Sequence, residues 1–284
     1  MKREDSGNIF LKESFDVLSL FDGMSCGQIA LERSGIKVNK YFASEIDKHS
    51  IKVTQHNYPE TIQLGDVTKI KSSDLPKIDL LIGGSPCQGF SFAGKQLNFE
   101  DPRSKLFFEF VRLKNELQPK YFLLENVKMK KEYENIISIY LNCEPIEISS
   151  SKFVPHNRKR LYWTNIGVKQ PKQREWDIND YIDGEGFATS CGIDRVFKKK
   201  EIFNTLTASY WKGIRGSSRP AVSIREGFLD DDREAHRMLS LSECERLQTV
   251  PIGYTNYVSK TQRYKMLGNG WTVDVIAHIF SHIT

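Results

Sequence analysis

The sequence predicts an α/β fold, a Rossmann-like and mostly parallel sheet with helices on both faces, joined to a small irregular domain. Short apolar runs that are typical of buried strands alternate with segments of helical periodicity, which is the pattern of a parallel sheet. Several of these runs end in an acid or a glycine, at the strand ends where open α/β sheets bind ligands. At 284 residues the chain can bury one sizeable core and carry one small appended domain.

The elements follow in order along the chain. Strands are expected at Val17–Phe21, Val38–Ala43, Ile62–Leu64, Ile78–Ile82 and Tyr121–Leu124, and strand-like runs recur at Pro145–Ser149 and Arg160–Thr164. Helices are expected at Gln28–Arg33, Asp47–His56, Ser104–Leu117 and Val273–Phe280. Gly35 and Pro59 end the first two helices, and Ser240 with Glu243 forms a capping box that opens another.

The stretch from residue 167 to residue 237 differs from the rest because it is polar, basic and weakly periodic. We therefore expect residues 1–166 and 238–284 to form the main domain and residues 167–237 the small one. The segment Ser151–Pro220 holds 14 Lys and Arg against 7 Asp and Glu, although the whole chain has a net charge of only +5. A concentrated basic stretch suits a polyanionic partner, and the commoner alternative is a solvated surface.

Composition excludes several classes of protein. Hydrophobic residues make up 39% and charged residues 27%, which is ordinary for a globular protein, and no apolar run approaches the length of a membrane span. The N-terminus has no apolar signal region, so we expect a cytoplasmic protein that does not enter membranes. The five cysteines form no Cys-x-x-Cys pair, which argues against a disulfide framework or a metal site.

Cys87 lies in the turn Gly84-Ser85-Pro86-Cys87-Gln88, directly after a predicted strand. A cysteine on a turn at the end of a strand is accessible to substrates, and its thiolate is a strong nucleophile. Taken alone, such a cysteine is more often a small apolar residue that fills a turn. Its place at the carboxyl end of a strand favours the nucleophile.

Acids and glycines at the ends of the first three strands predict a nucleoside pocket. The first strand runs into Phe21-Asp22-Gly23-Met24-Ser25-Cys26-Gly27, which lacks the glycine triplet that binds dinucleotide phosphates. Glu45 ends the second strand and suits the two hydroxyls of a ribose, and Asp66 follows the third and suits an adenine amino group. Each acid can alternatively cap a helix.

Three further residues could bind a heterocyclic base. Glu125 ends the strand expected beside that of Cys87, where its carboxyl group could hydrogen-bond the ring, and a helix cap is its alternative role. Arg158 and Arg160 alternate, so both side chains are expected on one face of a strand. They could bind a carbonyl oxygen, a phosphate or Glu125, or they could form a basic sheet edge.

Together these motifs, in this order, resemble the DNA cytosine-5 methyltransferases that use S-adenosylmethionine. The resemblance runs from Val17 to Phe280 apart from the variable middle, and it includes Arg103–Phe108, Leu239–Gln248 and Gly268–Val273. It implies a flipped-out cytosine in double-stranded DNA as substrate, attacked by Cys87 in a covalent mechanism. A prokaryotic or phage member with some similarity to the animal de novo branch is expected, with residues 167–237 as its target-recognition domain.

The resemblance also assigns roles to individual residues. Catalysis is expected of Cys87, Glu125, Arg158 and Arg160. Cofactor binding is expected of Phe21, Gly23, Cys26, Gly27, Glu45, Ile46, Asp66, Val67, Pro86, Asn269, Trp271 and Val273. DNA binding is expected of Gln88, Ser91, Arg103, Thr205, Thr207, Tyr210 and Lys212.

Two departures from the family pattern stand out. His156 replaces the glutamine that usually begins the arginine motif, and Trp271 replaces a residue that is small in many bacterial members. Two alternative functions stay open, a tRNA cytosine-5 methyltransferase and a catalytically silent regulatory paralogue. A cognate restriction endonuclease is a candidate partner, and we expect a monomer or weak dimer in a bacterial or phage-infected cell.

Overall fold

A computed structural model describes residues 14–85, 102–184, 186–191, 197–214, 219–223 and 236–284. Its main body is a seven-stranded sheet with the strand order β3-β2-β1-β4-β5-β7-β6. The strands are β1 (Phe15–Leu20), β2 (Val38–Ser44), β3 (Ile62–Gln63), β4 (Leu80–Gly84), β5 (Tyr121–Asn126), β6 (Ile146–Ser149) and β7 (Lys159–Thr164). The first five pair in parallel, and β7 runs antiparallel to both β5 and β6. The predicted α/β class is confirmed.

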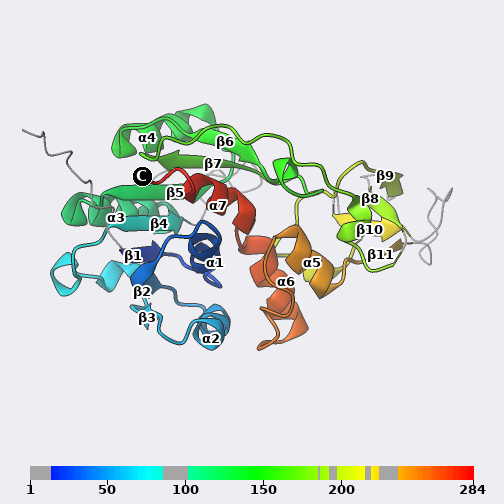
Figure 1. Ribbon diagram of the computed structural model, residues 1–284, viewed down its shortest axis with the longest axis horizontal. Helices are drawn as coiled ribbons and strands as arrows, with labels where there is room; N and C mark the ends of the chain where they lie inside the picture. Colours follow the sequence, from blue (N-terminus) through cyan, green and yellow to red (C-terminus); the bar gives the residue numbers. More distant parts are fainter. Residues whose placement is uncertain (1–13, 86–101, 185, 192–196, 215–218, 224–235) are drawn as a thin grey trace, which may run out of the picture.

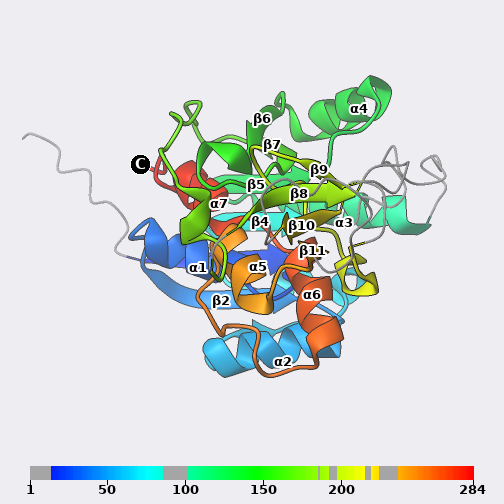
Figure 2. The same cartoon turned by 90° about the vertical axis from the view of Figure 1, so that its right-hand side faces the viewer.

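Seven helices of the described residues accompany the sheet. They are α1 (Cys26–Arg33), α2 (Lys48–Asn57), α3 (Pro102–Leu117), α4 (Lys131–Leu141), α5 (Leu241–Leu247), α6 (Lys260–Asn269) and α7 (Val273–Phe280). Figure 2 shows α1 and α7 on one side of the sheet and α3 and α4 on the other. Alternation along the strands explains the two layers, because Val17 packs in the core under α1 and α7 while Leu18 packs in the core under α3 and α4.

The sequence predicted several helix boundaries through their caps. The side chain of Asp47 accepts the N–H of His49 and begins α2, and Ser240 and Glu243 form the expected capping box of α5. Gly35 follows α1 with a φ of +74°, a conformation that favours glycine. The helices α4 and α6 were not predicted from the sequence.

The region between residues 167 and 237 is more regular than expected. It contains a four-stranded antiparallel sheet of β8 (Phe187–Cys191), β9 (Phe197–Lys199), β10 (Pro220–Ser223) and β11 (His236–Arg237) in the order β11-β10-β8-β9. Figure 1 shows this small sheet at the right-hand end, beyond α5 and α6. Phe203 and Leu206 nevertheless pack in the same hydrophobic core as Val17 and Ile276. The small sheet is therefore joined to the main body by continuous packing.

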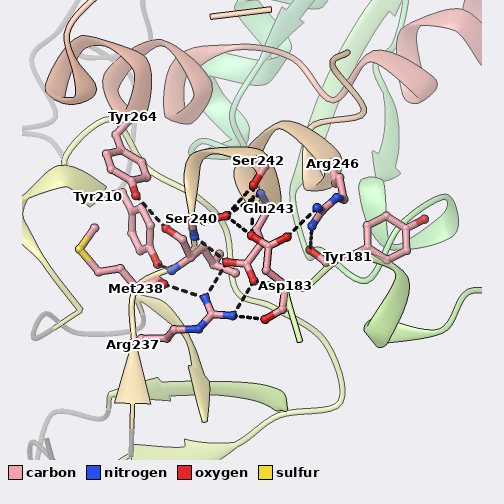
Figure 3. A network of polar contacts seen from close by, with 11 residues as sticks. Tyr181, Asp183, Tyr210, Arg237, Met238, Ser240, Ser242, Glu243, Arg246 and Tyr264 are labelled. Carbon is pink, nitrogen blue, oxygen red and sulfur yellow. Dashed lines mark hydrogen bonds and ion pairs between the residues drawn. The ribbon is translucent and has the colours of Figure 1, made fainter. Parts of the chain in front are cut away.

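A polar network ties the small sheet to α5 (Figure 3). The fully buried carboxylate of Glu243 accepts two hydrogen bonds from Arg237 of β11, at 2.7 and 2.8 Å, and others from the N–H groups of Asp183 and Ser240. Asp183 in turn pairs with Arg246 at 2.6 Å. Bidentate arginine–carboxylate contacts are directional, so the network fixes the small sheet relative to the helix.

We expect Arg237→Met to lower the free energy of unfolding by about 3 kcal/mol, because the carboxylate of Glu243 would remain buried without its cation. Glu243→Gln should cost less, although its NH2 group would face one of the two backbone N–H groups. The amide oxygen can still accept the other, and Arg237, whose side chain is 32% exposed, can turn toward water. Urea unfolding of the two variants measures the difference. Equal losses in the two variants would contradict this account.

Among the described residues, no helix combines the length and the apolar character that crossing a membrane requires.

Candidate active site

A cavity of about 380 Å³ lies at the carboxyl ends of the central strands β1, β2, β4 and β5. Residues of the first loop and Glu45 line one end, and Gly84, Glu125, Arg158 and Arg160 line the other. Helix α6 and the turn after it contribute Lys265, Asn269 and Trp271. We call these the cofactor end and the base end, after the roles that the sequence predicts for their residues.

At the cofactor end, a tight loop holds a carboxylate. Phe21 and Gly23 have φ angles of +56° and +60°, and the N–H of Gly23 donates to Oε2 of Glu45 at 2.8 Å. The other oxygen of Glu45 accepts the N–H groups of Ile46 and Asp47, at 2.7 and 2.8 Å. Three backbone donors therefore fix this side chain where the second strand ends.

The remaining predicted cofactor residues of the first three strands differ in exposure. Ile46 is 78% exposed, which is unusual for a large apolar side chain and fits a surface that another molecule covers. Asp66 caps a short 3₁₀ turn by accepting the N–H and the hydroxyl of Thr68, which is the cap alternative that its sequence position left open. Val67 is buried behind it and, like Ile46 and Asp66, does not line the cavity.

Helix α1 begins directly behind the loop. Cys26 lines the cavity but is buried, and this burial raises the pKa of its thiol to about 12. At Gly27 a Cβ would lie 2.5 Å from the Ile82 side chain and 2.8 Å from the Tyr41 hydroxyl, so only glycine fits there. Gly27 thus lets the helix pack closely on the sheet, beside the cavity rather than in its wall.

The last motif closes the cavity from the C-terminal side. Asn269 and Trp271 line it, whereas Val273 is fully buried at the start of α7 and donates its N–H to the carbonyl of Gln248. The side chain of Gln248 donates to the carbonyls of Leu267 and Gly270 and accepts the hydroxyl of Thr272. The turn between α6 and α7 is therefore held from inside the protein.

The base end is organised around Glu125. Its strand β5 pairs with β4 so that Gly84 lies opposite Glu125, as expected for neighbouring strands. Oε1 of Glu125 lies 3.0 Å from Nε of Arg160, and Oε2 accepts the indole N–H of Trp271 at 3.1 Å. The side chains of Glu125 and Arg160 are only 11% and 14% exposed, so this ion pair is largely buried.

Arg158 makes different contacts from Arg160, although both line the cavity. Its guanidinium donates to the carbonyls of Leu206, Gly268 and Asn269, at 3.2, 3.1 and 3.2 Å. Burial, together with the charge of Arg160, lowers its pKa to about 9. Arg158 therefore joins the segment that follows the small sheet's β9 to the turn after α6.

His156 stands in this same junction. It is fully buried, and its Nε2 accepts the N–H of Leu206 at 3.0 Å. Burial, with the nearby charges of Arg158 and Arg160, lowers the pKa of His156 to about 3. Histidine in place of the family's usual glutamine at position 156 thus supplies a hydrogen-bond acceptor but also a ring that can be protonated.

The buried imidazole of His156 leads us to predict that the folded protein loses stability in acid. Because the folded pKa of about 3 lies below the ordinary 6.5, the contribution of neutral His156 is complete above pH 6.5 and is lost as the pH falls toward 3. Over that interval wild-type stability should fall by up to about 1.4 kcal/mol per pH unit from this residue. His156→Gln should reduce this slope in unfolding titrations, and the same substitution at the exposed His56 should not. An unchanged slope in His156→Gln would contradict the assignment.

Pro86, Cys87, Gln88 and Ser91 lie outside the described residues, as does the side chain of Arg103 at the start of α3. The first described stretch ends at Ser85, before the gap that contains Cys87. The hydroxyl of Ser85 accepts a hydrogen bond from the side-chain amide of Asn126 at 3.1 Å. Gly84 and Ser85 both line the cavity. The segment that carries Cys87 therefore leaves the sheet at the base end, beside Glu125.

The predicted DNA-binding residues of the small domain differ in their exposure to solvent. The hydroxyl of Thr205 donates to the carbonyl of Asn157, and Thr207 and Lys212 are exposed. Tyr210 is 1% exposed, and its hydroxyl hydrogen-bonds the carbonyl of Pro220 and the N–H of Leu239. Tyr210 thus packs in the core, whereas its neighbour Trp211 is 44% exposed with the Lys212 ammonium over its ring.

Several cavity residues were missed by sequence reasoning, among them Asp22 and Lys265. Asp22 accepts hydrogen bonds from Ser25 and Tyr41, and burial raises its pKa to about 6. Lys265 of α6 reaches Asp47 at 3.1 Å. Asp22 belongs to the first loop and could have been named from its place there. Lys265 could not, because the helical pattern of α6 is weak.

Comparisons with known proteins identify the family of the chain. The family model described as "C-5 cytosine-specific DNA methylase" matches residues 15–200 and 172–284. The type II methyltransferase M1.ScrFI of Lactococcus lactis subsp. cremoris is 30% identical over 92% of this chain and 76% of its own length. The orphan methyltransferase M.SPRI of Bacillus phage SPR is 40% identical over 57% of this chain, but the match spans only 40% of that protein.

Solved structures share the fold. The Entamoeba histolytica methyltransferase EhMeth has a TM-score of 0.76 at 20% identity, over 95% of this chain and 98% of its own. The S. pombe Dnmt2 methyltransferase has a TM-score of 0.72 at 19% identity, over 94% and 97%. Because the family model covers nearly all of the described chain, the chain belongs to the C-5 cytosine-specific DNA methylases, which are DNA (cytosine-5)-methyltransferases that use S-adenosylmethionine.

Proposed function

We propose that this chain methylates carbon 5 of a flipped-out cytosine in a short sequence of double-stranded DNA. The observation that carries the proposal is the buried pair of Glu125 and Arg160, which faces the cavity beside the strand that leads to Cys87. A carboxyl group and a guanidinium side by side match the N3, amino and carbonyl edge of cytosine. Such an edge is reached only after the base leaves the duplex stack.

The cofactor end suits S-adenosylmethionine by its charge. Asp22, Glu45 and Asp47 line it, and three carboxyl groups favour a ligand that carries positive charge over one that carries phosphates. Glu45 would bind the ribose, with Ile46 against the adenine, and Asn269 and Trp271 would close the pocket. When bound, S-adenosylmethionine supplies the methyl group that becomes attached to carbon 5 of the base.

The chain's own residues perform the remaining steps. The thiolate of Cys87 forms a bond to carbon 6 of cytosine, and the electron pair of the 5,6 double bond moves to carbon 5. The carboxyl group of Glu125, in its protonated form, donates to N3 and accepts from the amino group, so that its proton neutralises the negative charge that develops on the ring, and Arg160 binds the carbonyl oxygen. Loss of the proton from carbon 5 to solvent re-forms the double bond and expels the thiolate.

Residues 1–166 and 238–284 would form the catalytic domain and residues 167–237 the target-recognition domain, with Thr207 and Lys212 at the DNA. A cognate restriction endonuclease and a cytoplasmic location fit the type II relatives. Within this proposal Arg158 holds the two parts together, Pro86 serves the cofactor, and Gln88 and Ser91 serve the DNA.

The deciding experiment follows the transfer of a labelled methyl group from S-adenosylmethionine to duplex DNA and, separately, to tRNA. Bisulfite sequencing of DNA from cells that express the chain then gives the modified base and its sequence context. Transfer to cytosine in DNA supports the proposal. Transfer to tRNA alone, or cofactor binding with no transfer, would reject it in favour of one of the two alternative functions.

A further inference from the structure

The indole of Trp271 lies between helix α1 and the base end of the cavity. Its Nε1 donates to Oε2 of Glu125 at 3.1 Å. Its other edge approaches the start of α1, since a Cβ on Gly27 would lie 3.8 Å from Cζ3 of the ring. One side chain of the last motif therefore contacts the carboxylate expected to bind the base.

The two oxygens of Glu125 have separate partners. Arg160 faces Oε1 and Trp271 faces Oε2, so the carboxylate cannot rotate without losing a contact. The site is largely shielded from water, with 11% of the Glu125 side chain exposed. The hydrogen bond from the Trp271 indole to a charged group in such surroundings is stronger than it would be in water. Together with the ion pair to Arg160, whose Nε has no hydrogen-bond partner among the described residues, it restrains the carboxylate.

The backbone that carries Trp271 is itself held in place. Gln248 is fully buried, donates to the carbonyl of Gly270 at 3.2 Å and accepts the hydroxyl of Thr272 at 2.7 Å. Arg158 donates to the carbonyls of Gly268 and Asn269. The residues on both sides of Trp271 thus have internal partners, and a side chain on a fixed turn can position another group.

Gly84 leaves the space in which Trp271 and Glu125 meet. A Cβ at Gly84 would lie 3.1 Å from both Oε2 of Glu125 and Nε1 of Trp271. Its φ is not in the left-handed region, so the backbone of β4 does not itself require glycine. An alanine here would therefore press on both partners of the hydrogen bond, which would have to move apart by a few tenths of an ångström.

We propose that Trp271 is a positioning residue that holds Glu125 for base binding through its indole N–H. The proposal rests on the proposed function and adds a role to a residue expected only in the wall of the cofactor pocket. It also explains why a large aromatic residue can replace the small residue of many family members. The bulk of the indole is accommodated by Gly27 and Gly84, and its N–H acts on the carboxylate.

The test is Trp271→Phe, which keeps an aromatic ring and removes the N–H. We expect kcat for methyl transfer to DNA to fall about tenfold, the size expected for a hydrogen bond to a charged group. The KM for S-adenosylmethionine should stay within about twofold, because the ring still closes the pocket. Gly84→Ala, which leaves donor and acceptor chemically intact but crowds both, should also lower kcat more than it raises this KM.

Trp163→Phe is the matched control. Trp163 is fully buried in β7 and its Nε1 donates to the hydroxyl of Ser138 at 3.0 Å, away from the cavity. This variant loses a comparable indole hydrogen bond and some stability, and its kcat should equal that of the wild type below the unfolding transition. In a Glu125→Ala background, single-turnover transfer should show little further effect of Trp271→Phe.

The possible results distinguish the positioning role of Trp271 from the proposed methyl transfer itself. If Trp271→Phe has wild-type kcat, or only a raised KM for S-adenosylmethionine, Trp271 is a wall of the pocket and the positioning role is wrong. An independent, multiplicative effect in the Glu125→Ala background would reject it as well. Absence of transfer by the wild-type protein, in contrast, would reject the proposed function itself.

Discussion

Replacement of Cys87 by alanine should abolish methyl transfer, with a loss of at least about 10⁴-fold that is typical of removing a covalent nucleophile. Three other cysteines are poorly suited to take over the role. Burial raises the pKa of Cys26 to about 12, and it raises the pKa values of Cys143 and Cys244 as well. Because the thiolate is the reactive form, these groups are poor nucleophiles at neutral pH.

Covalent trapping makes this prediction specific. A duplex that carries 5-fluorocytosine at the target has no proton to lose from carbon 5, so in the presence of S-adenosylmethionine the methylated thiol adduct would persist. The wild type should give a protein–DNA band that resists denaturation, and Cys87→Ala should give none. Cys143→Ala, at a half-buried free cysteine after α4, should behave like the wild type. A persistent band in Cys87→Ala would place the nucleophile elsewhere.

Replacement of Glu125 by glutamine should lower kcat by about 100-fold or more, in the range observed for groups that transfer or share protons in a transition state. The amide keeps the size of the carboxylate but removes the negative charge beside Arg160, and it leaves that buried cation without its counter-ion. Steady-state kinetics with a defined DNA substrate measure the effect.

Glu147→Gln provides the comparison, because Glu147 also forms an ion pair in the main sheet. It contacts Lys128 at 2.9 Å on the exposed side of β6, and its loss should change neither kcat nor KM. Thermal unfolding and cofactor binding of Glu125→Gln show how much of its defect is structural. Wild-type turnover in a folded Glu125→Gln protein would refute the role assigned to this carboxyl group.

The mostly parallel sheet was largely predictable because buried parallel strands are nearly continuous apolar runs, whereas of its strand order only the neighbourhood of β4 and β5 was expected. Leu80–Gly84 and Tyr121–Asn126 are clear examples, and each ends at a residue of the site. Helix caps were predictable because they depend on residues close together in the sequence, as with Ser240 and Glu243. The helices α4 and α6 were missed because the exposed apolar residues Ile139 and Tyr140 blur the periodicity of the first, and few apolar residues mark the second.

The site itself was predictable in part. Glu45, Glu125 and Arg160 line one cavity, as residues at neighbouring strand ends should. The partners of Arg158 and Trp271 were not predictable, because they come from contacts between segments about 110 and 146 residues apart. The burial of Tyr210 and the exposure of Trp211 likewise depend on packing between the small sheet and α6, which local sequence does not encode.

The contact between Gly268 and Thr207 bears on how such an enzyme could acquire a new sequence preference. A Cβ on Gly268 would lie 2.2 Å from the backbone of Thr207, and Arg158 holds the carbonyls of Gly268 and Leu206 together. Exchange of the whole stretch 167–237 for that of a relative would therefore import a foreign backbone at this contact. A chimaera that keeps Phe203–Thr207 from the host and exchanges only what surrounds it would retain the junction, so an exchange should be made in smaller pieces than the whole stretch 167–237.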